Sequence, residues 1–343
     1  MKRNSFEIGG VEVAPGKRRT IELPIARLYT HTEMGLTVQV VHGRKPGPTL
    51  FVSAALHGDE INGVEIIRRL LKRKFVANLR GTLIAIPIVN GFGFINNSRY
   101  LPDRRDLNRM FPGSSTGSLA GRIADLFMRE IAGRSTVGID LHTGSNHRFN
   151  LPHIRANLDD AQTLRLARAF GAPVMVNAKT RDGSLRETVA ELGIPVLLYE
   201  AGEALRFDEL SIRTGLRGII SVMRSMDMLP PKKLKRTRPV FQSSASKWVR
   251  APISGIITQR QRIGSQVSKG DLLGVVSDPY GEESRNVYAP VAGVVLGRLE
   301  LPLVYQGDAL FHLGVIEGDP DAGHILEELA SDLRQEDYTV RQI

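Results

Sequence analysis

The sequence predicts an α/β protein, in which a mixed sheet flanked by helices is followed by a second, smaller all-β domain. Between about residue 45 and about residue 228, short apolar runs alternate with segments of helical spacing, which is typical of an α/β sheet. A stretch rich in proline and lysine follows, and beyond it a short pattern occurs twice. We therefore expect a first domain over 1–228, a linker over 229–245, a β-sandwich or barrel over 246–318 and a tail over 319–343.

The N-terminal residues up to about 45 have the alternation of polar and apolar side chains that is typical of strands. It is clearest at Ala26–Tyr29 and Leu36–Val41. We expect these strands to extend the edge of the main sheet.

A strand followed by a helix is predicted where the first candidate site residues occur. Thr49–Ala55 is a short apolar run preceded by prolines, and Ile61–Lys74 has apolar residues at helical spacing. His57 and Glu60 fall in the turn between them, where α/β folds place ligands beyond the carboxyl ends of their strands. This turn is therefore a candidate binding position.

Two further predicted strands are followed by polar residues in the same way. Val137–Leu141 precedes His142, and Pro195–Tyr199 precedes Glu200. All these side chains are expected at the same edge of the sheet. Helical patterns complete the alternation at Leu119–Ile131 and Ala161–Phe170.

Two histidines and one glutamate next to strand ends fit a catalytic zinc site with one open position. The set consists of His57, Glu60 and His142. A histidine at a strand end is more often a hydrogen-bonded loop residue. However, the chain has eight histidines, and others such as His31 and His324 lack a comparable setting. We therefore expect one zinc ion per chain.

Hydrolysis at a zinc ion needs a base for the attacking water and positive charge for the oxyanion. Glu200 is the candidate base and Glu203 its competitor, although either could be a solvated surface carboxylate. The turn-rich segment Arg99–Gly113 offers the charge. Within it, Asn108 and Arg109 have the donors that hold a carboxylate, unless the segment is only a solvated basic loop.

Two copies of one pattern predict that the C-terminal domain has two matching halves. Ala251–Ile257 matches Ala289–Val295, and Lys269–Gly274 matches Gln306–Phe311. This repeat resembles a β-sandwich of the biotinyl/lipoyl type. The central hairpin, around Ser277–Ser284, contains no lysine that could accept such a cofactor. We expect the domain to shape the mouth of the site or to mediate assembly.

Composition limits the class of protein. The 343 residues are 42% hydrophobic and 24% charged, as in ordinary soluble domains, and no apolar run is long enough to span a membrane. The N-terminus has no secretory signal pattern, and there is no cysteine for disulfides or thiolate ligands. The net charge is +10, and basic residues are densest at Lys232–Arg238, which we interpret as part of the linker. We expect a cytoplasmic enzyme without nucleic-acid or membrane partners, and homo-oligomerisation stays open.

Four segments in order resemble the succinylglutamate desuccinylase/aspartoacylase family, the amidohydrolase branch of the zinc carboxypeptidase-like fold. They are His57–Glu60, Asp106–Phe111, Asp140–Gly144 and Glu200 with its strand. The resemblance covers about residues 40–225 and includes an expected β-rich C-terminal domain. It implies that His57, Glu60 and His142 bind zinc and that Glu200 activates the water.

The resemblance also implies that Asn108 and Arg109 hold the substrate carboxylate. Arg99, next to Tyr100, matches the arginine that polarises the scissile carbonyl in this family. The stretch from Arg99 to Asn108 is longer than the expected pattern, so Arg104 and Arg105 remain alternatives.

Asn150–Arg155 resembles a subgroup of these deacylases. In it, His153 and Arg155 are either pocket residues or parts of a structural loop.

The function expected from these observations is zinc-dependent hydrolysis of the amide bond of a small N-acyl amino acid or related N-acyl carboxylate. One alternative is a metallocarboxypeptidase that acts on peptides. Another is a non-catalytic scaffold that retains the fold, although a scaffold has no need of two metal histidines, Glu60 and Glu200.

Overall fold

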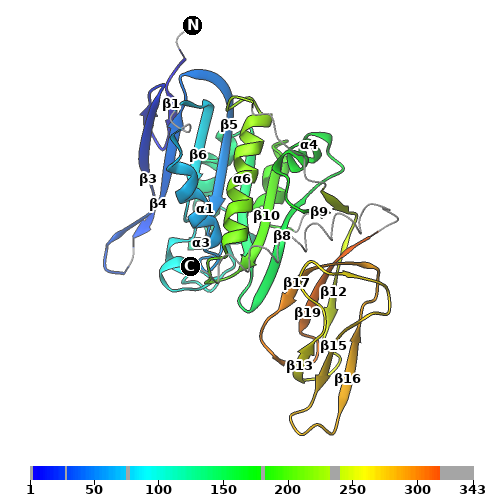
Figure 1. The fold of residues 1–343 in the computed structure, drawn as a ribbon. Helices are drawn as coiled ribbons and strands as arrows, with labels where there is room; N and C mark the ends of the chain where they lie inside the picture. The colour runs from blue at the N-terminus through cyan, green and yellow to red at the C-terminus, as the bar shows by residue number, and fades with distance from the viewer. Residues whose placement is uncertain (1–2, 28, 75–77, 179–181, 232–239, 317–343) are drawn as a thin grey trace.

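The computed structural model describes residues 3–27, 29–74, 78–178, 182–231 and 240–316. The basic run at 232–238 and the tail predicted over 319–343 lie outside the described residues. Figure 1 shows a large sheet with helices on its faces and, below it, a smaller β structure formed by the last strands.

A 13-stranded sheet contains most of the strands. Its main path is β12-β19-β17-β8-β10-β7-β5-β6-β4-β3, while β9, β11 and β14 pair beside it. The central strands β6, β5, β7 and β10 are parallel neighbours, and β4 and β8 run antiparallel to them. The strands up to residue 203 are β1 (Phe6–Ile8), β2 (Val11–Val13), β3 (Lys17–Arg27), β4 (Glu33–His42), β5 (Lys45–Ala54), β6 (Arg80–Ile86), β7 (Val137–Gly144), β8 (Arg148–Ala156), β9 (Val174–Asn177) and β10 (Val196–Glu203).

Helices cover both faces of this sheet. The buried side chains of α1, α4 and α6 pack with one face, and those of α3 and α5 pack with the other. The predicted α/β class with a mixed sheet and a small β unit is therefore confirmed. The helices are α1 (Asn62–Leu71), α2 (Gly91–Ile95), α3 (Leu119–Glu130), α4 (Ala161–Phe170), α5 (Leu185–Glu191) and α6 (Glu209–Ser225), with 3-10 turns at Leu107–Arg109 and Ala132–Arg134.

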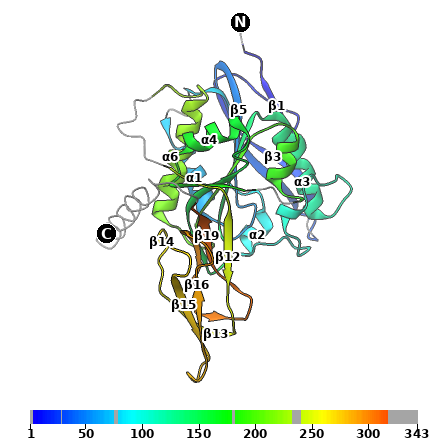
Figure 2. The ribbon, with the colours of Figure 1, turned by 90° about the vertical axis from the view of Figure 1, so that its right-hand side faces the viewer.

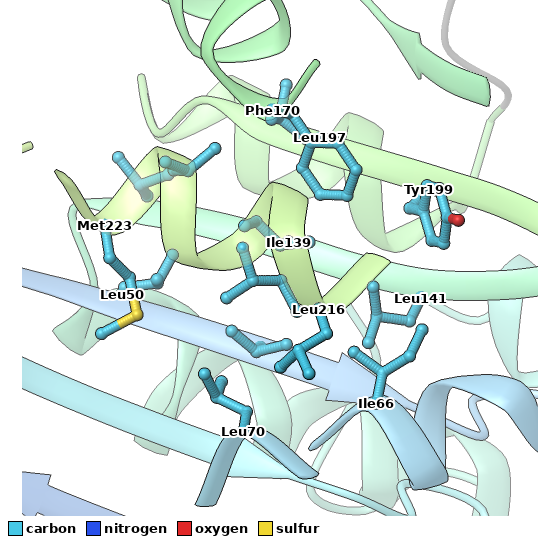
Figure 3. Close-up of a cluster of buried hydrophobic side chains, with 14 of the residues drawn as sticks. Leu50, Ile66, Leu70, Ile139, Leu141, Phe170, Leu197, Tyr199, Leu216 and Met223 are labelled. Carbon is cyan, nitrogen blue, oxygen red and sulfur yellow. The ribbon is translucent and has the colours of Figure 1, made fainter. Parts of the chain in front are cut away.

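Helix α6 illustrates how sequence determines these elements. Its side chains Ile212, Leu216 and Ile219 recur at helical spacing and are buried against the strands. Figure 3 shows Leu216 among side chains of the central strands, including Leu141 of β7. Asp208 caps the helix, because its carboxylate accepts a hydrogen bond from the backbone N–H of Ser211 at 2.7 Å.

The C-terminal strands form two matching units, in keeping with the repeat in the sequence. The first unit is β12 (Ser246–Arg250), β13 (Gly255–Gln259), β14 (Gln266–Val267) and β15 (Leu272–Ser277). The second is β16 (Ser284–Tyr288), β17 (Gly293–Leu299), β18 (Leu303–Val304) and β19 (Ala309–Val315). Strand β13 pairs with β15 and β18, and β17 pairs in the same way with β19 and β14. The two units enclose one apolar core.

This β structure is joined to the large sheet by strand pairing. Strand β17 pairs with the start of β8, and Figure 2 shows the C-terminal strands projecting from that end of the molecule. A second junction is β11 (Phe241–Ser243), which pairs in parallel with β9. Part of the range predicted as a linker is thus a strand of the large sheet, and the domain division stays a prediction.

Two predicted strand ends were wrong by a few residues. His142 and Glu200 were expected to follow their strands, but they lie inside β7 and β10. The reason is that Glu200 pairs with His142, so the ladder continues past the apolar runs. Apolar periodicity marks burial, whereas a strand ends where backbone pairing ends. In the described part of the chain, no helix is long and apolar enough to cross a membrane.

Candidate metal centre and active site

The candidate site lies at the carboxyl ends of three neighbouring parallel strands, β5, β7 and β10. Ala54 pairs with Leu141 and His142 pairs with Glu200, so the ends of the strands are level. His57 and Glu60 lie in the turn between the end of β5 at Ala54 and the start of α1 at Asn62. Sheet order therefore brings together side chains that are up to 143 positions apart (57 to 200).

The turn that contains His57 and Glu60 is held against helix α2. The backbone N–H of Glu60 donates to the carbonyl of His57 at 3.1 Å. At Gly58, a Cβ atom would lie 2.0 Å from the backbone carbon of Gly93. Only glycine fits this approach, which fixes the turn that presents both side chains.

Three metal-ligand side chains converge as predicted. The Nδ1 atoms of His57 and His142 lie 2.7 Å and 2.8 Å from the two carboxylate oxygens of Glu60. One ligand atom from each residue lies within 4.8 Å of the others. All three residues are buried. Two imidazoles and one carboxylate form a metal-binding group, and all three residues line the cavity.

The other ring nitrogen of each histidine contacts a carboxylate. His57 Nε2 lies 3.2 Å from Asp106, and His142 Nε2 lies 2.7 Å from Asp140. Ser53 in turn donates to Asp140 at 2.7 Å. Such outer contacts fix the tautomer and orientation of metal-ligating histidines. The donor set therefore fits a metal ion, and the two Nδ1 atoms, which both face the Glu60 carboxylate, would be its nitrogen ligands.

The outer residues were not assigned this role from the sequence. Asp140 lies two positions before His142 on one strand, so both side chains point to the same face. That spacing was an available signal. Asp106 and Ser53 had none, because their contacts depend on how distant segments pack.

The electrostatics of the group favour positive charge. Burial alone would lower the pKa of His57 and of His142. The carboxylates of Glu60 and Asp106 outweigh burial and raise the pKa of His57, and those of Asp140 and Glu60 raise the pKa of His142 well above its usual value. A divalent cation would satisfy the same carboxylates while the histidines stay neutral.

Glu200 faces this group from β10. Its carboxylate accepts a hydrogen bond from Asn150 Nδ2 at 3.0 Å and lies 3.9 Å from Arg155 Nη1. Burial raises the pKa of Glu200, which makes the carboxylate a better proton acceptor near neutral pH. Its competitor Glu203 lies 3.8 Å from Arg206 and is not among the residues that line the cavity.

Of the three candidate arginines, Arg99 lies at the metal-binding group. It contacts Glu60 at 3.2 Å and Asp106 at 2.9 Å. Arg104 and Arg105 are exposed and do not line the cavity.

Asn108 lies in the 3-10 turn, where its Oδ1 accepts from the backbone N–H of Leu185 at 3.0 Å. This bond orients the amide, whose other end is a donor. Arg109 follows in the same turn, and its side chain donates to the carbonyl of Asn108.

One cavity of about 340 Å³ joins these residues. All seven predicted site residues line it: His57, Glu60, Arg99, Asn108, Arg109, His142 and Glu200. His153 and Arg155 of β8 line it too, which favours the pocket over the structural loop that the sequence left open. His153 Nδ1 donates a hydrogen bond to the carbonyl of Leu151 at 2.6 Å, and burial, reinforced by Arg155, lowers the pKa of His153 to about 4.

Several lining residues were not predicted. Trp248 and His312 come from the C-terminal strands, and their rings stack at 4.3 Å with an interplanar angle of 8°. Arg148 and Arg186 add positive charge. Pairing between segments this distant in sequence leaves no local pattern, so the sequence offered no signal for these residues.

Comparison with known proteins gives one family match. The profile of the succinylglutamate desuccinylase/aspartoacylase catalytic domain matches residues 46–226. The N-alpha-acetyl-L-2,4-diaminobutyric acid deacetylase of Halomonas elongata is 27% identical over 322 residues, which cover 89% of this chain and 92% of that protein.

Solved structures show the same fold. The product-bound ectoine utilization protein EutE from Ruegeria pomeroyi superposes with a TM-score of 0.79 at 25% identity, covering 87% of this chain and 95% of that one. A succinylglutamate desuccinylase/aspartoacylase from Rhodobacter sphaeroides gives a TM-score of 0.80 at 24% identity, covering 88% and 96%.

Proposed function

From the premise that this chain belongs to the succinylglutamate desuccinylase/aspartoacylase family, we propose that it is a zinc-dependent enzyme that removes the acyl group from a small N-acyl amino acid. The family predicted from four sequence segments is confirmed by the match over residues 46–226, more than half of the 343. The observation that carries the proposal is the buried His57, Glu60 and His142 group, which opens into the cavity that Glu200 lines.

His57, Glu60 and His142 are the residues that would hold the zinc ion. Nitrogen and carboxylate ligands in this number suit zinc, and the absence of cysteine excludes thiolate ligation. When bound, zinc supplies Lewis acidity for the amide carbonyl and for water. Asp106 and Asp140 would keep the two imidazoles oriented, because they contact the Nε2 atoms and leave the Nδ1 atoms to bind the metal.

Glu200 acts as the general base and then as the general acid. Its carboxylate takes a proton from the attacking water and returns it to the nitrogen of the leaving amine. The raised pKa of Glu200 suits both steps, since a catalytic group works best when its pKa lies near the working pH.

Arg99, Asn108 and Arg109 bind the scissile carbonyl and the carboxylate of the substrate. Arg99 polarises the scissile carbonyl from beside Glu60 and stabilises the oxyanion. Arg109 and the amide of Asn108 hold the carboxylate, because a guanidinium offers paired donors that match two carboxylate oxygens. The further arginines of the cavity, Arg148, Arg155 and Arg186, favour an anionic substrate.

The size of the cavity favours a small substrate over a peptide. About 340 Å³ suits an N-acyl amino acid, and Trp248 and His312 limit the space on the side of the C-terminal strands. This makes a metallocarboxypeptidase the weaker candidate. An N-acetylated diamino acid is the first substrate to try, since the Halomonas elongata relative is named for that activity.

A hydrolysis screen tests the proposal. Purified protein is incubated with N-acetyl-, N-succinyl- and N-formyl-amino acids and with acylated diamino acids, with and without added zinc, and release of free amine is measured. We expect zinc-dependent release from at least one substrate and a loss of that release in Glu200→Gln. Zinc-loaded protein that cleaves carboxyl-terminal residues from peptides but none of these compounds would favour the carboxypeptidase.

A further inference from the structure

Asn150 occupies an unusual position between the catalytic base and the C-terminal strands. It lies on β8, which pairs with β10 along one edge and with β17 along the other. Asn150 is opposite Gly202 on β10 and opposite Gly297 on β17. It is 8% exposed and lines the cavity.

The side chain of Asn150 contacts Glu200 directly. Its Nδ2 donates to Glu200 Oε2 at 3.0 Å, while Glu200 Oε1 lies on the side of Arg155. A hydrogen bond to an ionised acceptor is stronger than one between neutral groups. It restricts the rotation of the carboxylate and occupies one lone pair of Oε2, so Oε1 is the more available oxygen for a proton.

A bulge in β8 accounts for the reach of this side chain. Glu200 pairs with His153, and Gly202 pairs with Asn150, so β8 advances by three residues (150 to 153) while β10 advances by two (200 to 202). An extra residue in one strand redirects the side chains next to it, and such bulges occur beside active sites.

The other side of Asn150 is fitted closely to β17. At Gly297, a Cβ atom would lie 2.6 Å from Asn150 Oδ1 and 3.3 Å from Cβ of His312. Any larger residue at 297 would therefore displace the asparagine amide. Strand β17 thus limits where the amide can lie, and the amide in turn contacts the base.

We propose that Asn150 is a positioning residue for Glu200, and that Gly297 of the C-terminal half keeps Asn150 in place for this role. The inference rests on the proposed function, in which Glu200 is the base. It assigns the C-terminal strands a part in proton transfer, besides their contribution to the wall of the cavity.

A double-mutant cycle separates this role from a direct contact with substrate. In Asn150→Ala we expect kcat to fall by about 10- to 100-fold, the worth of a hydrogen bond to a charged group, with KM changed by less than about threefold. Metal content and the circular dichroism spectrum should match those of the wild type. In the Glu200→Gln background, Asn150→Ala should cause no further loss, because its effect passes through the base.

Gly297→Ala provides a second, independent perturbation. We expect it to lower kcat in the wild type, since the new methyl group displaces the Asn150 amide. In the Asn150→Ala background it should cause no further loss of kcat. The matched control is Gly121→Ala on α3, where the added Cβ meets only ordinary contacts of 3.5 Å or more and activity should be unchanged.

Two results would overturn the role of Asn150 while leaving the proposed function intact. One is wild-type kcat in Asn150→Ala. The other is a loss that multiplies with that of Glu200→Gln, which would show that Asn150 acts on the substrate. If the wild-type enzyme turns over none of the substrates of the screen, the proposed function fails and the role fails with it.

Discussion

At the residue scale, each histidine of the metal-binding group contacts a carboxylate through its second ring nitrogen: His57 contacts Asp106 and His142 contacts Asp140. His57, Glu60 and His142 could be predicted because each lies at the end of an apolar run, and neighbouring parallel strands end at one edge of a sheet. Asp106 and Asn150 could not, because their contacts form only after distant segments pack. Local patterns thus determine where a site lies, and tertiary packing determines how its side chains are held.

Replacement of both metal histidines tests the ligand set. In His57→Ala/His142→Ala we expect the loss of stoichiometric zinc, measured by elemental analysis of purified protein. The fold should persist, because both side chains lie beyond the apolar cores and the carboxylates left behind can take up protons. Full zinc occupancy with an unchanged circular dichroism spectrum would show that the metal binds elsewhere.

His153 is expected to make stability depend on pH. Burial lowers its pKa from 6.5 to about 4, so between these values the unfolded chain binds the proton that the folded chain excludes. The contribution of His153 to the free energy of unfolding is therefore present in full above pH 6.5. It is lost as the pH falls toward 4, by about 3 kcal/mol in total. The free energy of unfolding, measured by urea denaturation over this pH range, should depend less steeply on pH in His153→Gln than in the wild type. Equal slopes in both proteins would contradict the assignment.

At the scale of elements, periodicity predicted which segments are helices and strands better than it predicted where they end. Helix α4 has the predicted bounds, Ala161–Phe170, since an aspartate before it and a glycine after it mark both ends. Strands β7 and β10 extend past their apolar runs because their backbones continue to pair. Strand β11 lies where a linker was expected, since three residues are too few to show a period.

The cap of helix α6 offers a test at this scale. Asp208→Ala removes the side chain that accepts the backbone N–H of Ser211, so the free energy of unfolding should fall by about 1 kcal/mol. Asp208→Asn keeps an acceptor oxygen and should lose much less. Chemical denaturation of both variants measures the difference, and an equal loss in both would assign the effect to charge.

At the scale of the whole molecule, the sequence repeat predicted the C-terminal β structure, and shaping the mouth of the site was one of the two roles expected of it, but the residues that line the cavity were not predicted. The repeat indicates which strands are equivalent, but it does not indicate that Trp248 and His312 line the cavity or that β17 pairs with β8. The net charge of +10 did not indicate where the positive charge gathers. In the structure, Arg99, Arg109 and Arg155 place part of it in the cavity.

The C-terminal β structure, strands β12–β19, is expected to carry no biotinyl or lipoyl group. The turn between β15 and β16, residues 278–283, contains no lysine that could accept one. Intact-mass spectrometry of protein from its native host should therefore give the mass of the polypeptide, 37.8 kDa. An added mass that matches either cofactor on Lys247 or Lys269 would contradict this expectation.

The tandem pairing of β8 has a practical consequence for anyone who wishes to shorten the gene. One edge of β8 pairs with β10, and the opposite edge pairs first with β17 and then with β9. A polypeptide truncated after residue 228 would lose β17 and uncover the backbone N–H and C=O groups of residues 148–150 beside the active site. An open strand edge is a template for self-association. Truncation should therefore produce insoluble aggregates and not a minimal enzyme.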